Sequence, residues 1–451
     1  MKAAATELLV QGGTVVTMDR VRRVLRGDVL VRDERIAWIG ATGRAPRPNS
    51  GTFRRTLDAS GGFVLPGLVQ SHVHLCQTLA RGLADDLELL DWLRRRIWPL
   101  EAAHDARSLR LSAEIGCAEL LLGGTTAILD MGTVHHQDEV FDACARSGLR
   151  VVGGKAMMDA PGGGIPRGLR ETTRASLAES DALAARWDGA AGGRIRYAYA
   201  PRFVLSCTEE LLRAVAARVA DGARVHTHAS ENRTECALVR RLTGRPNVAY
   251  LHALGLGGPR ATFAHCVHLA GGERKLLARA GTHVAHCPSS NLKLASGIAD
   301  VPRLLAAGVR VSLGADGAPC NNNLDAWREL RLAAQLAKVQ GGPTALPAAE
   351  ALALATRGGA AALGLEAEIG SLEPGKRADV IVVRATGLHT VPEGEDVYAT
   401  LVYAAGAQDV EHVIVDGRLV VRGRALLTLD TARLRAEAAP AQKRLARRAG
   451  L

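Results

Sequence analysis

Residues 63–75 read FVLPGLVQSHVHL. The apolar run is as long as a buried strand, and it ends in two histidines, His72 and His74. Side chains two residues apart in a strand project from the same face, so both imidazoles can reach one ion. A buried strand that ends in two potential ligands is typical of a parallel barrel, whose functional side chains lie at the carboxyl ends of its strands.

Seven further segments of the same kind lie between residues 63 and 365. Helical stretches separate these short apolar runs, for example at 108–122 and 209–219. The runs are TTAILDM (125–131), VVGGKAMM (151–158), RIRYAYAP (194–201), RVHTHA (224–229), ATFAHCV (261–267), THVAHC (282–287) and VRVSLGAD (309–316). Eight βα repeats over roughly 300 residues predict an α/β fold of the TIM (β/α)8 type.

Both ends of the chain carry alternating, β-branched segments instead. LLVQGGTVVTM starts at Leu8 and DVLVRDERIAWIG at Asp28, and the same character returns in ADVIVVRA from Ala378 and EHVIVDGRLVVRG from Glu411. We therefore expect three parts. They are a composite β-sandwich domain from residues 1–62 and 366–430, a catalytic barrel at 63–365, and a C-terminal helix at 431–451.

Composition narrows the classes of function. Hydrophobic residues make up 47% and charged residues 23% of the chain, which is typical of an ordinary globular protein. The net charge of +11 is spread along the chain, and its densest cluster, 443–448, has no aromatic interleaving. These features predict no nucleic-acid partner, and they favour a solvated helix at the C-terminus.

Cysteine usage and hydropathy bear on the compartment. The eight cysteines form no C-x-x-C pair, which argues against a zinc ribbon and a redox dithiol. Reduced, buried thiols are typical of a cytoplasmic protein, so we expect that location. The first residues lack a long apolar stretch, and there is no uncharged apolar run of about 18 residues. We expect neither export nor a membrane span.

Polar side chains also end the later predicted strands. They are His226 and His228 on the fifth, His265 on the sixth, His286 on the seventh and Asp316 on the eighth. Three imidazoles and a carboxylate around an open position suit a hydrolytic zinc site, because the ion lowers the pKa of its water to about 7. We favour His228 over His226 because it lies three residues before Glu231, an acid that falls just past the strand end.

Six motifs extend this pattern over nearly the whole chain: PGLVQSHVH, HTHASE, AHCVHL, AHCPSSNLKLASG, SLGADG and IGSLEPGKRADVIVV. Jointly they resemble the amidohydrolase superfamily, within it the branch that deaminates purines and related rings. The resemblance implies a distorted (β/α)8 barrel with a small β-sandwich formed by both termini. It also implies a hydrolase that replaces a ring amino group by an oxo group and releases ammonia.

The resemblance assigns roles to individual residues. The metal ligands would be His72, His74, His228 and Asp316. Asp316 would also move protons between water and the leaving amine, Glu231 would protonate the ring nitrogen, and His265 would orient the attacking water.

The number of metals follows from the fourth strand. Relatives with two metals carry a carboxylated lysine there, whereas this chain reads RIRYAYAPRF. We expect one divalent metal, zinc, with iron as the alternative. Lys155 belongs to the third strand, where its role is either structural or ligand-facing.

Other residues bear on the substrate. Gln77, Arg202 and Phe203 look like the guanine-recognition residues of guanine deaminases, because glutamine bonds ring nitrogens and arginine donates to a ring carbonyl. Trp92 either stacks on the ligand or belongs to the core. His286 would line the mouth. This set favours a guanine-like substrate.

The alternative is a deaminase of 5′-deoxyadenosine, S-adenosylhomocysteine or methylthioadenosine. Those relatives usually carry a histidine where this chain has Arg202, but GADGAPCNNNLD, from Gly314, resembles adenosine-type and triazine-type members more closely. A triazine chlorohydrolase and a non-catalytic barrel homologue are further alternatives. The partner would be a small amino-heterocycle, and we expect a homo-oligomer.

Overall fold

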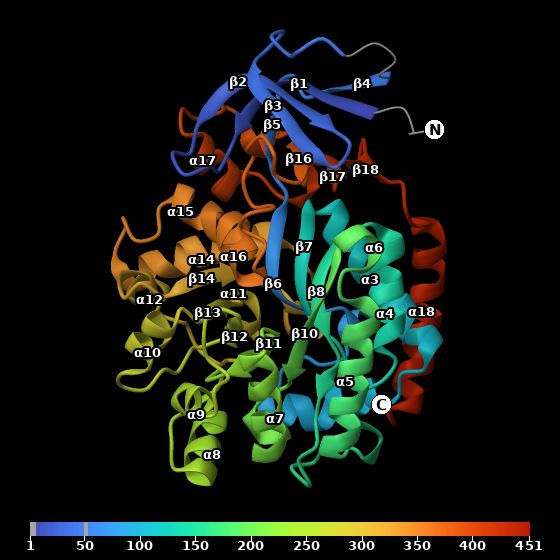
Figure 1. Cartoon of the computed structure of the whole chain (residues 1–451), viewed down its shortest axis with the longest axis vertical. Helices are drawn as coiled ribbons and strands as arrows, with labels where there is room; N and C mark the ends of the chain where they lie inside the picture. Colours follow the sequence, from blue (N-terminus) through green and yellow to red (C-terminus); the bar gives the residue numbers. More distant parts are fainter. Residues whose placement is uncertain (1–5, 49–52) are drawn as a thin grey trace.

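The computed structural model describes residues 6–48 and 53–451. Strands from the two ends of the chain form one nine-stranded sheet at the top of the molecule in Figure 1. These strands are β1 (Thr6–Val16), β2 (Val24–Arg32), β3 (Arg35–Ala41), β4 (Phe53–Asp58), β5 (Phe63–Pro66), β16 (Val380–Val383), β17 (Val410–Val415), β18 (Arg418–Arg422) and β19 (Ala425–Leu426). The predicted sheet from both termini is therefore present.

The expected first barrel strand is divided between the two sheets. β5 pairs with β1 and with β16 in the terminal sheet. After Gly67 the chain continues as β6 (Leu68–His74), which leads down from that sheet into the barrel (Figure 1). Pro66 lacks a backbone N–H and separates the two segments, so one apolar run in the sequence serves two sheets.

The second sheet is parallel throughout the strands that form the barrel wall. Its members are β6, β7 (Thr125–Met131), β8 (Arg150–Gly154), β9 (Ala156–Met157), β10 (Ile195–Pro201), β11 (Arg224–Ala229), β12 (Ala261–His265), β13 (His283–His286), β14 (Arg310–Leu313) and β15 (Asp316–Gly317). The short β15 follows β14 and pairs with β6, so it joins the two ends of the sheet. The predicted (β/α)8 barrel is confirmed.

A glycine permits this closure. A Cβ atom at Gly314 would lie 2.6 Å from the backbone oxygen of His72, too close for any other residue. Only glycine therefore lets the connection between β14 and β15 pass β6 at this distance. The close approach places Asp316 beside the two histidines of β6.

Helices cover the outside of the barrel (Figure 1). The α-helices are α1 (Leu89–Trp92), α2 (Trp98–Ala102), α3 (Ala106–Leu122), α4 (Gln137–Ser147), α5 (Thr173–Trp187), α6 (Ala190–Gly193), α7 (Glu209–Ala220), α8 (Arg233–Thr243), α9 (Asn247–Ala253), α10 (Glu273–Ala280), α11 (Pro288–Lys293), α12 (Val301–Ala306), α13 (Ala318–Asn321), α14 (Ala326–Gly341), α15 (Ala348–Ala353), α16 (Gly359–Leu363), α17 (Val397–Ala399) and α18 (Thr431–Arg448). Among the described residues, no helix is both long and apolar enough to cross a membrane.

Shorter helical turns complete the fold. They are η1 (Leu75–Ala80), η2 (Leu93–Ile97), η3 (Arg167–Leu169), η4 (Val204–Ser206), η5 (Leu354–Gly358), η6 (Leu388–Thr390), η7 (Thr400–Ala404) and η8 (Ala407–Asp409). The C-terminal helix α18 packs against one of them, because Gln442 donates hydrogen bonds to the backbone oxygens of Leu79 and Arg81. It thereby holds the segment that follows the β6 histidines.

Candidate metal centre and substrate pocket

Four side chains converge at the carboxyl end of the barrel. His72 and His74 come from β6, His228 from β11 and Asp316 from β15, and one potential ligand atom of each lies within 4.8 Å of all the others. The Nε2 atoms of His72 and His74 are each 3.3 Å from Asp316 Oδ1. Three imidazole nitrogens and a carboxylate match the donor set of a hydrolytic metal site.

Backbone carbonyls fix the orientation of two of these histidines. His74 Nδ1 donates to the oxygen of Met131 and His228 Nδ1 donates to the oxygen of Arg202, both at 2.7 Å. Since a carbonyl can only accept, Nδ1 carries the hydrogen and Nε2 keeps its lone pair. Burial lowers the pKa of His74 to about 3, so this imidazole is neutral near pH 7.

The residues fit a divalent cation. His72 Nε2 is buried without a hydrogen-bond partner and points into the cluster, as expected of an atom that a metal would satisfy. The cluster contains one set of four ligands, and the end of β10 brings no lysine to it. The expectation of a single divalent metal is confirmed. His228, and not His226, lies in this set of four potential ligands.

His265 and Glu231 lie beside the four potential metal ligands. His265 Nε2 lies 3.4 Å from Glu231 Oε2 and 3.8 Å from Asp316 Oδ2, while its Nδ1 is bonded to Asn291 Oδ1 at 2.9 Å. Burial, and then the charge of Asp316, raise the pKa of Glu231 well above its ordinary value. The neighbouring imidazoles hold the pKa of Asp316 well below its ordinary value despite its burial. The site therefore shifts the pKa values of its two carboxyl groups in opposite directions.

The backbone is strained at three positions next to or within this group of residues. Ser230, His265 and Asp316 have φ angles of 54°, 72° and 62°, in the left-handed region that L-residues other than glycine seldom adopt. Each such residue costs about 1–3 kcal/mol, and such strain clusters at functional sites. The strain coincides with the strand ends that carry the candidate chemistry.

A small cavity lies next to the cluster. The residues that line it are His74, Gln77, Leu89, Trp92, Leu93, Arg202, Phe203, His228, Glu231 and Asp316. The predicted substrate contacts Gln77, Trp92, Arg202, Phe203 and Glu231 thus all line this cavity. His286, at the end of β13, is buried but does not line it. Lys155 is not there either, because its Nζ is buried 2.6 Å from Glu171 Oε1 in an ion pair that ties the following loop to β8.

Glu101 is a buried residue of the site that the sequence did not reveal. Its carboxylate accepts hydrogen bonds from Arg202 Nη1 at 2.6 Å and Nη2 at 3.1 Å, and from Gln77 Nε2 at 2.9 Å. Arg202 therefore brings no uncompensated positive charge to the cavity. Glu101 follows the segment WLRRRIWPL and lies 101 residues before its partner, so no local spacing signals the contact.

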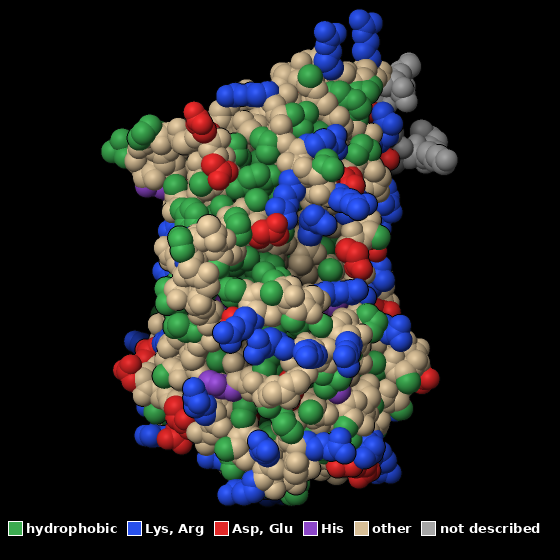
Figure 2. Space-filling model, turned by 90° about the vertical axis from the view of Figure 1, so that its left-hand side faces the viewer, with side chains coloured by type: hydrophobic (Ala, Val, Ile, Leu, Met, Phe, Trp, Pro, Cys, Tyr) green, Lys and Arg blue, Asp and Glu red, His purple; other side chains and the backbone are tan. Residues whose placement is uncertain are grey.

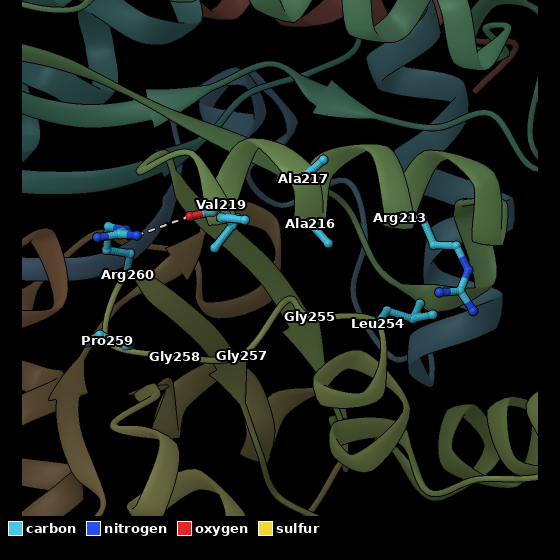
Figure 3. Close-up of a pocket in the computed structure, with 11 residues that line it drawn as sticks. Arg213, Ala216, Ala217, Val219, Leu254, Gly255, Gly257, Gly258, Pro259 and Arg260 are labelled. Atoms are coloured by element: carbon cyan, nitrogen blue, oxygen red, sulfur yellow. Dashed lines mark hydrogen bonds between the residues drawn. The ribbon is translucent and has the colours of Figure 1, made fainter.

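A crevice on the outer surface of the barrel has a different character from this cavity. It lies between α7 and the segment 254–260, with a volume of about 510 Å³ (Figure 3). Figure 3 shows Arg260 donating to the backbone oxygen of Val219 at 3.2 Å, while Arg213 lies at the other end. No histidine or carboxylate lines this crevice, so we assign it no chemistry.

The fold and the site define a metal-dependent hydrolase built on a TIM-like barrel. Residues 63–420 match the model of the amidohydrolase family, and the chain belongs to that family. It is a hydrolase of carbon–nitrogen bonds other than peptide bonds.

Several proteins are similar to this chain. A 5-methylthioadenosine/S-adenosylhomocysteine deaminase of Desulforudis audaxviator is 43% identical over 90% of this chain and 91% of its own length. A 5′-deoxyadenosine deaminase of Methanothermobacter thermautotrophicus is 40% identical over 94% and 95%. The crystal structure of an adenosine deaminase from Xanthomonas campestris with bound zinc superposes with a TM-score of 0.90 at 34% identity, covering 98% of this chain and 99% of that one.

Proposed function

We propose that this enzyme removes the amino group of the adenine ring in a 5′-modified adenosine, such as 5′-deoxyadenosine, methylthioadenosine or S-adenosylhomocysteine. The observation that carries a deamination is the pair Glu231 and Asp316. Their pKa values are pushed in opposite directions at one cavity beside the metal ligands. The names of the two relatives support the adenosine part of the proposal.

The chemistry needs a nucleophile, an acid and a proton carrier. When bound, the divalent ion lowers the pKa of a water molecule toward 7 and polarises it for attack. Asp316 takes the proton that this water loses and returns it to the leaving amine. Glu231 enters protonated, donates its proton to the ring nitrogen beside the amino-bearing carbon, and regains a proton from the hydroxyl group of the adduct as the oxo group forms. His265, 3.4 Å from Glu231 and 3.8 Å from Asp316, orients the oxygen between them.

The cavity beside the four potential ligands is smaller than the proposed substrate. The cavity measures about 20 Å³, which holds one water molecule and no purine. Leu89, Trp92 and Leu93 close it from the α1–η2 segment. We therefore expect this segment to move outward when the substrate binds, which would place Trp92 against the ring or the sugar.

A guanine-like substrate is the second candidate, on a specific observation. Gln77 Oε1 is buried without a hydrogen-bond partner, and Gln77 Nε2 and Arg202 Nη2 donate to the same oxygen of Glu101. The wall thus offers an unused acceptor near arginine donors, which complements the adjacent N–H and C=O of guanine. The two relatives favour adenosines instead, so the guanine preference inferred from Gln77 and Arg202 takes second place.

Ammonia release from the zinc-loaded enzyme separates the candidates. We expect turnover of 5′-deoxyadenosine, methylthioadenosine and S-adenosylhomocysteine to exceed that of guanine and 8-oxoguanine. Exclusive turnover of guanine would refute the proposal. If guanine is the substrate, Arg202→Ala should lower guanine turnover far more than it lowers zinc content. Chloride release from a chlorotriazine, without ammonia release from any purine, would favour the chlorohydrolase alternative. No turnover by the metal-loaded protein would favour a non-catalytic role.

Two expectations about the setting complete the proposal. We expect a homo-oligomer, and we expect it in the cytoplasm because the eight cysteines of the described chain are free and seven of them are buried. Sedimentation of the purified protein measures its oligomeric state. A species of 47.5 kDa alone would mean a monomer.

A further inference from the structure

His226 lies directly behind the metal cluster. It precedes His228 by two residues on β11, and its Nε2 is 2.8 Å from Nδ1 of His72. Both rings are fully buried, with centroids 4.9 Å apart and planes at 87°. The contact is edge-on and in hydrogen-bond range, so the two imidazoles share one hydrogen along this line.

This partner differs in kind from the partners of the other two histidine ligands. His74 and His228 donate to backbone carbonyls, which can only accept. An imidazole nitrogen can accept or donate, according to which of its nitrogens carries the hydrogen. The tautomer of His72 is therefore the one in the cluster that the backbone does not fix.

Two arrangements of the pair contain the same number of hydrogens. In the first, His226 Nε2–H donates to His72 Nδ1, and the second hydrogen of the pair is on His72 Nε2, which faces Asp316 Oδ1 at 3.3 Å. In the second, His72 Nδ1–H donates to His226 Nε2, and His226 carries its own hydrogen on Nδ1. Only the second leaves the lone pair of His72 Nε2 free for a cation.

We propose that His226 is the positioning residue that sets His72 in its metal-binding tautomer, by accepting the Nδ1–H of His72 on its own Nε2. His226 acts through His72 and does not itself touch the metal. Its Nδ1 is buried and has no hydrogen-bond partner among the described residues. The metal-binding arrangement thus leaves one N–H unsatisfied, and metal ligation by His72 offsets that cost. The proposal concerns the metal centre alone, so its failure would leave the proposed substrate untouched.

Nitrogen NMR on the unmodified, histidine-labelled protein reads the tautomer directly. In the zinc-loaded chain we expect the His226 spin system to show hydrogen on Nδ1 and none on Nε2. The spectrum of His226→Gln identifies which signals belong to His226. Hydrogen on His226 Nε2 in the zinc-loaded protein would overturn the proposal.

Two variants test the same point by zinc affinity, measured by competition with a chromophoric chelator. His226→Leu fills the space without an acceptor, and we expect it to bind zinc about 10–100-fold more weakly, as second-layer substitutions typically do. His226→Gln keeps a side-chain oxygen that can accept the Nδ1–H, so it should retain most of the affinity. Equal losses in the two variants, or parent affinity in His226→Leu, would contradict the proposal.

His283→Leu is the matched control for packing. His283 is also a buried strand histidine, on β13, but its hydrogen-bond contact is Arg310 Nη1 at 3.5 Å and not a metal ligand. It should leave zinc affinity unchanged, whatever it does to the unfolding temperature of the metal-free protein. A loss of zinc affinity in His283→Leu as large as in His226→Leu would assign the effect to packing and overturn the proposal.

Discussion

The two ends of the barrel differ in how their buried ionisable groups are paired. At the carboxyl ends of the strands, buried side-chain atoms have no hydrogen-bond partner in the described structure. They are His72 Nε2, Gln77 Oε1, Glu231 Oε1, His265 Nε2 and His286 Nδ1. At the amino ends, Arg150 lies 3.0 Å from both oxygens of Asp379 and 3.1 Å from Asp416, and Arg377 also reaches Asp416 at 3.0 Å.

This difference indicates that the carboxyl ends of the strands bind ligands, whereas the amino ends hold the two sheets together. An unsatisfied buried polar group costs about 1–3 kcal/mol, so a cluster of them is retained where a metal and a substrate complete the bonds. Arg150 begins β8, whereas Asp379 and Asp416 flank strands of the terminal sheet. This network therefore joins the two sheets. Figure 2 shows charged side chains on one face of the molecule, from the terminal sheet to the barrel.

The largest expected effect on activity follows from removing a predicted metal ligand at the carboxyl ends of the strands. His228→Ala leaves three ligands, and we expect zinc content to fall and ammonia release to drop by at least about 10³-fold, because the metal supplies several kcal/mol of stabilisation. The metal-free variant should lose only about 1 kcal/mol of unfolding free energy, from the bond to Arg202. Metal analysis and urea unfolding measure the two. A metal-free variant that unfolds at much lower urea would show that the cluster also carries stability.

Removing the acid tests the same end without disturbing the metal. Glu231→Gln cannot give up a proton, so we expect kcat to fall about 10²–10⁴-fold at unchanged zinc content. Asp316, a ligand, provides the contrast, because Asp316→Asn should lower zinc content and rate together. Loss of zinc from Glu231→Gln would mean that Glu231 supports the metal centre and not proton transfer.

The convergence of the four potential ligands was predictable because each of them lies at a strand end that the sequence marks. A period of two places His72 with His74, and apolar runs bounded by turn residues locate Asp316 at the eighth strand. Barrel topology then brings these distant strand ends together. The family resemblance added roles that spacing alone does not define.

Contacts that depend on packing of distant helices were not predictable. Glu101 lies in α2, and its pairing with Arg202 of the segment after β10 has no periodic signature. The division of residues 63–75 between two sheets was missed because both halves are equally apolar and only Pro66 and Gly67 separate them. The preference for guanine followed from the identities of Gln77 and Arg202 without knowledge of the carboxylate that both contact.

A substitution at the amino ends of the strands should lower the free energy of unfolding and leave the activity unchanged. Arg150→Met leaves Asp379 and Asp416 buried with fewer partners, and we expect a loss of about 3–5 kcal/mol of unfolding free energy. Rate and zinc content per folded molecule should stay at parent values. The exposed ion pair of Arg213 and Glu209 is the control, because Arg213→Met should cost less than about 1 kcal/mol. A fall in kcat of folded Arg150→Met would show that the two ends are coupled.

The smallest expected effect is a pH dependence of the unfolding free energy, caused by Glu329 near the carboxyl ends of the strands. Glu329 on α14 accepts hydrogen bonds from the backbone N–H of Ser289 at 3.0 Å and the side chain of Asn321 at 3.4 Å, beside the segments that flank Asp316. Burial raises the pKa of Glu329 to about 7, above its ordinary 4.5. The folded chain therefore binds more protons than the unfolded chain between those values, and unfolding free energy falls as pH rises through this window.

Glu329→Gln removes that titration but keeps an oxygen for Ser289. We expect parent and variant to be similar in unfolding free energy at pH 5 and the variant to be more stable, on the order of 1–3 kcal/mol, at pH 8. Urea unfolding of the metal-free proteins at both pH values measures the difference. If the difference does not change with pH, Glu329 is ionised in the folded chain throughout. The cost of burying charge at this end would then lie with the metal ligands and Glu231 alone.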